Sequence, residues 1–199
     1  MILHAALAIF AEHGFEGTST RAIGERAGLH YTLINYHFRT KDALWRATAE
    51  HFFTEMVDMW ERDAPDIDPS KPMELLKSEF RNLLHFSFSN PDFHRFMINE
   101  SRSNDDRLIW LMDTFLAPIM RRTVPQIEAA QAVGDLPDIN PVLVHYFLVG
   151  ATTVISSLGG EIREHLKDAP DGLDIAALYW DIVEQMIFRP HFFERPAHG

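Results

Sequence analysis

The sequence predicts an all-α protein of about nine helices, and three observations lead to this fold class. Apolar residues recur at helical spacing along the chain, and no segment shows the alternation of a half-buried strand. The pairs Asn90-Pro91 and Asn140-Pro141 are helix-start signals, because Asn caps a helix and Pro suits its first turn. Three prolines within Ala64–Pro72 mark a break between two helical regions.

The helices predicted before the break cover residues 2–13, 19–27, 31–37 and 40–63. Gly14 ends the first helix, and Thr18 or Ser19 caps the second. Gly28 makes the turn to the third helix, because glycine adopts a left-handed conformation at little cost. Thr40 caps the fourth and longest helix of this region.

The helices predicted after the break cover residues 72–88, 91–102, 105–131, 141–166 and 174–189. Pro118 and Pro125 should bend or split the helix at 105–131, because proline removes a backbone hydrogen bond. Gly134 should end this helix.

Composition limits the class of protein. The 199 residues contain no cysteine, which excludes disulfides, thiolate nucleophiles and cysteine-based zinc sites. No apolar run reaches the roughly 20 residues that span a bilayer, and the first residues lack the features of a signal peptide. We therefore expect a cytoplasmic protein with no membrane partner. No nucleophile elbow, phosphate loop or Glu-x-x-His pair is present, so we expect no enzyme, no cofactor and no metal.

The net charge of −11 is unevenly distributed. Residues 1–45 contain four basic and four acidic side chains, so the whole negative charge lies in residues 46–199. An acidic surface repels the phosphate backbone of DNA. If the chain binds a duplex, it should do so through its N-terminal part.

The segment 18–45 predicts two short helices that meet at a glycine turn, which is a helix-turn-helix arrangement. Gly24 lies where the first of these helices must approach the second closely. The apolar residues spaced to be buried between them are Ile23, Ala27, Leu29, Ile34 and Phe38.

The opposite side of the second short helix carries a polar and aromatic strip. At about 100° per residue, Thr32 and Tyr36 point away from Ile34, and Leu33 and Asn35 lie beside them. Such side chains suit the base edges and phosphates of DNA. Lys41, in the first turn of the next helix, would add a phosphate contact.

Residues 2–46 resemble the DNA-binding domain of the TetR family of transcriptional regulators. The matching or conservatively replaced positions are Gly14, Thr18, Ser19, Ile23, Ala27, Gly28, Ile34, His37, Phe38, Lys41 and Leu44. The resemblance implies a DNA-binding domain at 1–46 and an effector-binding and dimerisation domain at 47–199. It implies that double-stranded operator DNA is contacted by Thr18, Ser19, His30, Tyr31, Thr32, Leu33, Asn35, Tyr36, His37 and Lys41.

Two positions depart from the family pattern. His30 stands where a serine usually caps the recognition helix, so either the cap is weaker or His30 itself contacts DNA. Leu33 replaces a commonly polar residue, which favours an apolar contact such as one with a thymine methyl group.

Large apolar side chains within residues 46–131 predict a pocket for a small apolar or aromatic effector, although each alone also fits an ordinary core. The candidate lining residues are Phe52, Met56, Met59, Trp60, Phe86, Phe93, Phe96, Met97, Trp110 and Phe115. The helices at 141–166 and 174–189 predict a four-helix homodimer interface, with a monomer core as the alternative. Its candidate residues are Tyr146, Val149, Gly150, Thr153, Ser157, Leu178, Ile182, Gln185 and Met186.

The predicted function is therefore a ligand-responsive, sequence-specific DNA-binding regulator, in which the effector releases a repressor from its operator. Two alternatives stay open: a helical adaptor that binds a ligand or partner but no longer binds DNA, and a regulator whose ligand promotes DNA binding.

Overall fold

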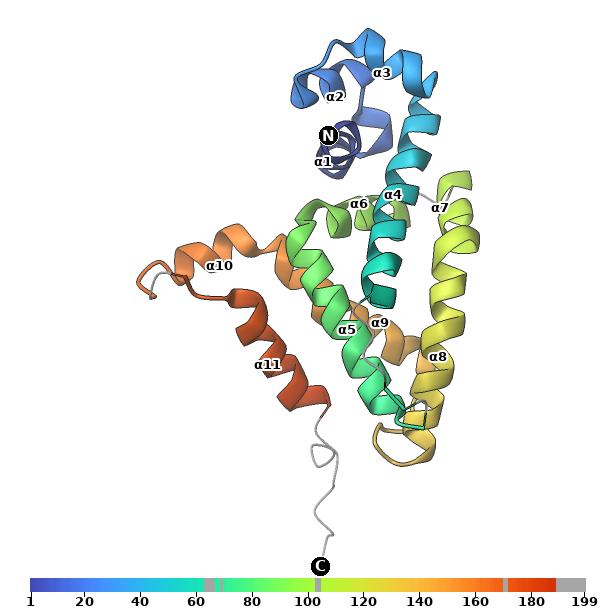
Figure 1. Ribbon diagram of the computed structural model, residues 1–199, viewed down its shortest axis with the longest axis vertical. Helices are drawn as coiled ribbons and strands as arrows, with labels where there is room; N and C mark the ends of the chain where they lie inside the picture. Colours follow the sequence, from blue (N-terminus) through green and yellow to red (C-terminus); the bar gives the residue numbers. More distant parts are fainter. Residues whose placement is uncertain (63–66, 69, 103–104, 170–171, 189–199) are drawn as a thin grey trace, which may run out of the picture. The chain divides into compact units, whose positions relative to one another are not determined.

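The computed structural model is helical, as Figure 1 shows, and describes residues 1–62, 67–68, 70–102, 105–169 and 172–188. The first four helices are α1 (Ile2–Gly17), α2 (Thr20–Ala27), α3 (Tyr31–Phe38) and α4 (Lys41–Arg62). The elements that follow are α5 (Pro72–Ser89), α6 (Pro91–Arg102), α7 (Asp106–Leu111), the π-helix η1 (Met112–Leu116), α8 (Ala117–Ala132), α9 (Pro141–Ser157), α10 (Gly159–His165) and α11 (Ile175–Ile187). The all-α prediction is confirmed, while part of the predicted break at 64–72 lies outside the described residues.

Side-chain caps fix several of the predicted helix starts. Thr40 Oγ1 accepts a hydrogen bond from the Ala43 amide at 3.0 Å, as expected for the start of α4. Asn140 Oδ1 accepts from the amides of Val142 and Leu143 at 3.0 and 3.3 Å. Each cap satisfies amides that have no carbonyl partner within the first turn of the helix.

Two of the nine predicted helices are divided. The helix expected at 105–131 is interrupted by η1, directly before Pro118, which has no amide proton for the α-helical ladder. The helix expected at 141–166 breaks at Leu158, and α9 and α10 form an angle of 66°. Gly159 and Gly160 follow that break, and consecutive glycines weaken a helix because they lose the most backbone entropy. Gly14 has non-helical backbone angles, with φ +67°, so the regular helix ends there as predicted and α1 continues to Gly17 beyond a kink.

The chain forms two compact units that do not coincide with the expected boundary at 46/47. One, here called the head unit, comprises Met1–Asp58 and Asn90–Phe115, so α6 and α7 join α1 to α3 and most of α4. The other, the body unit, comprises Met59–Ser89 and the residues from Leu116 onward. In the head unit α6 packs against α1, and Asn99 Nδ2 donates to the carbonyls of Phe10 and Ala11 at 3.3 and 2.9 Å.

A buried ion pair stabilises the head unit. Trp45 Nε1 donates to Glu100 at 3.1 Å, and Arg107 Nε donates to the other carboxylate oxygen at 3.3 Å. Burial raises the pKa of Glu100, and the charge of Arg107 and the Trp45 hydrogen bond oppose that rise. All three residues are used in packing α4 against α6 and α7, so this carboxylate has a structural role.

The body unit is centred on α5, which packs against α8, α9 and α11. Leu76, Leu84 and Phe86 of α5 are fully buried there. His145 of α9 is also buried, and its Nδ1 lies 2.8 Å from Thr123 Oγ1 of α8. Burial lowers the pKa of His145 to about 4, so the imidazole is neutral in the folded protein near neutral pH.

Among the described residues, no single helix is long and apolar enough to cross a membrane. The bent pair α9 and α10 reaches the required length and composition only when both helices are taken together.

Candidate DNA-recognition surface

The turn between α2 and α3 has the geometry that the sequence predicts. Gly28 adopts a left-handed conformation at φ +66°, which avoids the steric cost that a side chain would incur there. A Cβ at Gly24 would lie 2.9 Å from the Leu29 carbonyl oxygen, so a larger residue would push the two helices apart. Ser19, rather than Thr18, caps α2, since its Oγ accepts from the Ala22 amide at 3.1 Å.

Burial fixes which side of α3 faces its own unit. Ile23 of α2 and Ile34 of α3 are fully buried. Ala27, Leu29 and Phe38, which were also expected between the helices, are half-buried. Ile34 is the one residue of α3 that is fully withdrawn from solvent, so the rotation of this helix is set by a single apolar contact point and the glycine turn before it.

The opposite side of α3 is open to solvent. Tyr36 is 79% exposed, the highest value among the large apolar and aromatic residues of α3. The predicted contact residues that lie exposed on this helix are Tyr31, Thr32, Leu33, Asn35, Tyr36 and His37. We call them the α3 outer face.

His30 caps α3 through a long contact. Its Nδ1 lies 3.5 Å from the Thr32 amide and 2.8 Å from the Thr32 hydroxyl. The cap is thus weaker than a serine cap with a normal hydrogen-bond length, in line with the first of the two sequence alternatives. Because His30 is exposed and its ring contacts Tyr31 at 4.7 Å between centroids, it also lies beside the α3 outer face.

Thr18 does not belong to the exposed surface, which corrects its assignment as a DNA contact. Its side chain is buried, and its hydroxyl lies 2.7 Å from the carbonyl oxygen of Gly14 and 3.3 Å from that of Ile9. The hydroxyl donates to carbonyl oxygens near the kinked end of α1, where helical amide donors are missing. Ser19, the next residue, remains exposed and is the better candidate for a contact to phosphate.

Lys41 makes contacts within its own unit, and its expected phosphate contact stays a prediction. Its ammonium group donates to the carbonyls of Phe15 and Thr18 at 2.8 and 3.1 Å, and it lies 4.4 Å from the centroid of the Phe15 ring. A cation at the C-terminal end of a helix stabilises the unpaired carbonyls there. In the DNA-free protein Lys41 therefore joins the end of α1 to the start of α4.

Sequence reasoning missed Arg39. This exposed residue follows α3 directly and has a positive φ of +46°. It forms the link between α3 and α4, where a long basic side chain can reach phosphates beside a recognition helix. The signal available in the sequence was its position between Phe38 and the Thr40 cap.

The predicted effector residues fall into both units. In the head unit Phe52, Phe93 and Phe96 are buried, and successive ring centroids lie 6.2 and 6.4 Å apart. Phe115 contacts Trp110 at 5.4 Å, and Met56 is also buried. These contacts show that the aromatic residues pack against each other within the head unit.

In the body unit, the buried residues Trp60 and Glu79 lie beside two more accessible polar residues, Arg122 and Gln126. Arg122 donates to Glu79 at 2.7 Å, Gln126 donates to the same carboxylate at 3.0 Å, and the guanidinium lies 5.7 Å from the Trp60 ring centroid. Trp60 Nε1, Glu79 Oε2 and Gln126 Oε1 are buried and have no hydrogen-bond partner within the described part of the chain. Buried polar atoms of this kind are costly unless a ligand or water satisfies them.

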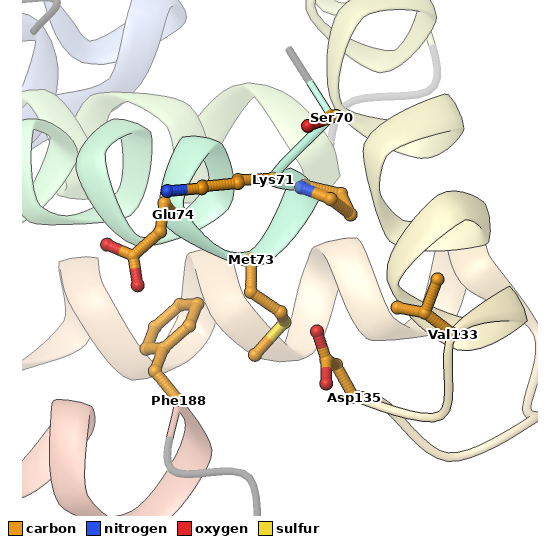
Figure 2. A pocket seen from close by; sticks show the side chains of 8 residues that line it. Ser70, Lys71, Met73, Glu74, Val133, Asp135 and Phe188 are labelled. Atoms are coloured by element: carbon orange, nitrogen blue, oxygen red, sulfur yellow. The ribbon is translucent and has the colours of Figure 1, made fainter. Parts of the chain in front are cut away.

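A separate pocket lies at the start of α5 in the body unit, with a volume of about 290 Å³. Figure 2 shows apolar and charged side chains facing it from three segments. Its lining residues are Ser70, Lys71, Pro72, Met73, Glu74, Val133, Asp135 and Phe188. None of the ten predicted effector residues is among them, and no pattern in the sequence indicates that these segments meet.

The predicted dimer residues of α11 are exposed, whereas those of α9 are only partly so. Leu178, Ile182 and Met186 form an exposed apolar row on α11, and Gln185 lies beside them. On α9 Tyr146 is exposed, but Val149, Gly150 and Ser157 are half-buried.

Thr153 of α9 is buried in its own unit and donates to the Val149 carbonyl at 2.8 Å, which corrects its assignment to the interface. The exposed apolar residues of α9 that sequence reasoning missed are Val142, Leu143, Phe147 and Val154. The exposed stripe is thus rotated by about one residue, or about 100°, from the predicted one.

The family model of bacterial regulatory proteins of the tetR family matches residues 2–48 of the chain. The chain is 25% identical over 115 residues to the probable HTH-type transcriptional regulator YttP of Bacillus subtilis (strain 168). That match covers 58% of this chain and 56% of YttP, so it spans little more than half of this relative.

A longer match is to the HTH-type transcriptional regulator RutR of Escherichia coli (strain K12). The two are 31% identical over 153 residues, which cover 76% of this chain and 70% of RutR. Among solved structures, AibR in complex with isovaleryl coenzyme A and operator DNA is similar in fold, with a TM-score of 0.68 and 18% identity over 94% of this chain and 96% of that one. Together with the helix-turn-helix geometry of α2 and α3, these matches show that the chain belongs to the TetR family of bacterial regulatory proteins.

Proposed function

We propose that this protein is a sequence-specific DNA-binding transcriptional regulator that represses its target and is released by a small apolar or aromatic effector. The observation that carries the proposal is the α3 outer face. Six consecutive or nearly consecutive side chains able to contact bases lie exposed there and are not used by the core of the protein. A helix of this kind, held by a glycine turn against α2, fits the major groove of DNA.

The residues of this surface have distinct proposed roles. Thr32, Asn35 and Tyr36 can form hydrogen bonds with base edges, and Leu33 can contact a thymine methyl group. Ser19, which caps α2, and Arg39, which directly follows α3, would contact phosphates.

We propose a homodimer that forms through the exposed apolar residues of α9 and α11. Two-fold symmetry places two α3 helices in successive major grooves, with half-sites about 34–36 Å apart. Large exposed apolar patches on a protein surface commonly mark such interfaces. The exposed row Leu178, Ile182 and Met186 supports this assignment for α11.

The effector would act on the domain that follows residue 46. AibR was solved with both isovaleryl coenzyme A and operator DNA, which supports a small-molecule effector as one way of controlling a related fold. A ligand that binds more tightly to the form with low DNA affinity shifts the population toward that form. The proposed contacts within the head unit are Phe52, Met56, Phe93, Phe96, Met97, Trp110 and Phe115.

The test is a titration of fluorescent duplexes with the full-length chain. Random duplex should bind at low salt and lose affinity steeply between about 50 mM and about 200 mM salt, because binding releases counterions. Sequences selected from a random pool should bind at least about a thousandfold more tightly than the random duplex. Failure to bind any duplex at low salt would contradict the proposal.

The adaptor alternative is supported by two observations. Residues 1–45 carry no net charge, and the ammonium group of Lys41 is occupied by carbonyls of α1. Both features reduce the electrostatic attraction to DNA. An adaptor would ignore duplex in the same titration, so one measurement separates the two functions.

A further inference from the structure

Two histidines and a glutamate from distant parts of the sequence converge in the head unit. His4 lies on α1, while His51 and Glu55 lie one turn apart on α4. One possible ligand atom from each residue lies within 4.8 Å of the other two. We propose that these three side chains form a binding site for a divalent transition-metal ion, of which Zn²⁺ fits the donor set best.

The donor chemistry selects the class of ion. Two imidazole nitrogens and one carboxylate oxygen are preferred ligands of Zn²⁺ and its neighbours in the transition series, whereas Mg²⁺ and Ca²⁺ prefer oxygen ligands. Three protein ligands leave the fourth tetrahedral position to water. All three side chains are at least partly accessible to solvent, so an ion can reach them.

The positions of the two rings are held by a rigid neighbour. Phe52 is fully buried, and its ring centroid lies 5.1 Å from that of His4 and 5.0 Å from that of His51. The two imidazole centroids are 5.7 Å apart. Because Phe52 cannot move without opening the core, it keeps both imidazoles on the same side of the interface between α1 and α4.

Only small side-chain rotations separate this arrangement from coordination. His51 Nε2 and Glu55 Oε2 are 4.0 Å apart, as an i,i+4 pair on one helix face. Ligands at about 2.0–2.2 Å from a tetrahedral Zn²⁺ lie roughly 3.3–3.5 Å from each other. The three ligand atoms therefore lie somewhat farther apart than in a formed site, and a bound ion would draw the side chains together.

Sequence reasoning missed this site for a clear reason. The Glu-x-x-His pattern places histidine three residues after glutamate, whereas this pair runs from His51 to Glu55 at a spacing of four. The third ligand, His4, is 47 positions away from His51 and reaches it only because α1 packs beside α4. A bound ion would join these two helices and so stabilise the head unit.

The experiment uses the full-length chain with Co²⁺ and Zn²⁺ as probes. Co²⁺ should bind with one ion per chain, give the intense visible absorption of a tetrahedral site and be displaced by Zn²⁺. His4→Ala should weaken binding at least about tenfold, because loss of even an outer partner of a metal ligand costs that much. Zn²⁺ should also raise the melting temperature of the parent protein but not that of His4→Ala.

The chain offers a matched control. His165 and Glu161 of α10 form another i,i+4 pair with the same 4.0 Å separation, and no third candidate ligand groups with them among the described residues. His165→Ala should therefore keep the absorption and the affinity of the parent. Glu55→Gln is a second variant, which removes a ligand from an already folded helix and should also weaken binding.

Three results would overturn the proposal: no Co²⁺ spectrum in the parent, equal losses in His4→Ala and His165→Ala, or unchanged affinity in both His4→Ala and Glu55→Gln. Circular dichroism of each variant shows whether it is folded. DNA binding is measured separately, so a negative result for the metal leaves the proposed regulator untouched.

Discussion

Helices α3 and α9 both have one exposed face, but the sequence predicts these faces with different success. On α3 all six predicted contact residues between Tyr31 and His37 are exposed, opposite the buried Ile34. On α9 the predicted stripe includes the buried Thr153 and misses the exposed Leu143 and Phe147. The two helices differ in what fixes their rotation.

The rotation of α3 follows from local constraints that are written in the sequence. Gly24 and Gly28 allow only one close approach between α2 and α3, and Ile34 is the apolar residue that fills it. On α9 the distribution of polar and apolar residues does not indicate correctly which side is buried. The hydroxyls of Thr152 and Thr153 donate to carbonyls one turn earlier, at 2.8 Å each, so these residues are buried without an outside partner. Small polar residues therefore mark the inner side of α9.

The largest expected effect tests the outer face of α9. Phe147→Asp places a charge on an exposed apolar stripe, where Phe147 is 62% exposed. If this stripe is the dimer interface, burying an unpaired charge should cost about 4 kcal/mol, or near a thousandfold in the dimer dissociation constant. Light scattering coupled to size exclusion measures this change. An unaltered oligomeric state would exclude this side of α9 from the interface.

A substitution in the glycine turn tests the rotation of α3. Gly24→Val forces a Cβ toward the Leu29 carbonyl at 2.9 Å and should destabilise the protein by about 3 kcal/mol. Gly150→Ala on α9 is the matched control, because its Cβ would meet no other described atom within 4 Å. It should be neutral or slightly stabilising, since alanine is the better helix former. Equal losses of unfolding free energy in the two variants would show that the close approach at Gly24 does not determine stability.

The buried imidazole of His145, on the inner side of α9, predicts that stability depends on pH. The pKa of His145 is lowered to about 4 by burial, while in the unfolded chain it is near 6.5. Between these values the unfolded state binds a proton that the folded state does not. The contribution of His145 is therefore complete above pH 6.5 and falls as the pH drops to about 4, by about 3 kcal/mol.

Denaturant unfolding of the parent and of His145→Asn across this range checks the prediction. The parent should lose more stability than the variant on acidification, because other groups contribute equally to both. Parallel curves would mean that α9 does not bury this imidazole.

Substitution of Lys41 tests whether this residue stabilises the protein in the absence of DNA. Lys41→Met keeps the alkyl stem beside Phe15 but leaves the carbonyls of Phe15 and Thr18 without a donor. Loss of charged hydrogen bonds of this kind should destabilise the DNA-free protein by about 2 kcal/mol. Arg39→Met, two residues earlier and exposed, should leave the melting temperature unchanged. If Lys41→Met were equally silent without DNA, the structural role of Lys41 would be excluded.

The sequence was sufficient where a feature depends on neighbours along the chain. Helix starts such as Asn140 and turns such as Gly28 are local, and both were predicted. It was insufficient where distant segments meet. Neither the carbonyls that hold Lys41 nor the approach of His4 to His51 can be inferred from spacing, because both depend on how α1 packs against α4.

The smallest expected effect concerns the α3 outer face itself. Tyr36 is 79% exposed, so Tyr36→Ala should change the unfolding free energy by less than about 0.5 kcal/mol. If Tyr36 contacts base edges, the same change should reduce the preference for a selected operator over a scrambled duplex by about 1–2 kcal/mol, or roughly tenfold. Affinity for the scrambled duplex should barely change, whereas Arg39→Ala should weaken binding to both duplexes equally. A uniform loss in Tyr36→Ala would assign this residue to the phosphate backbone, and the open side of α3 would then hold the protein on DNA without reading its sequence.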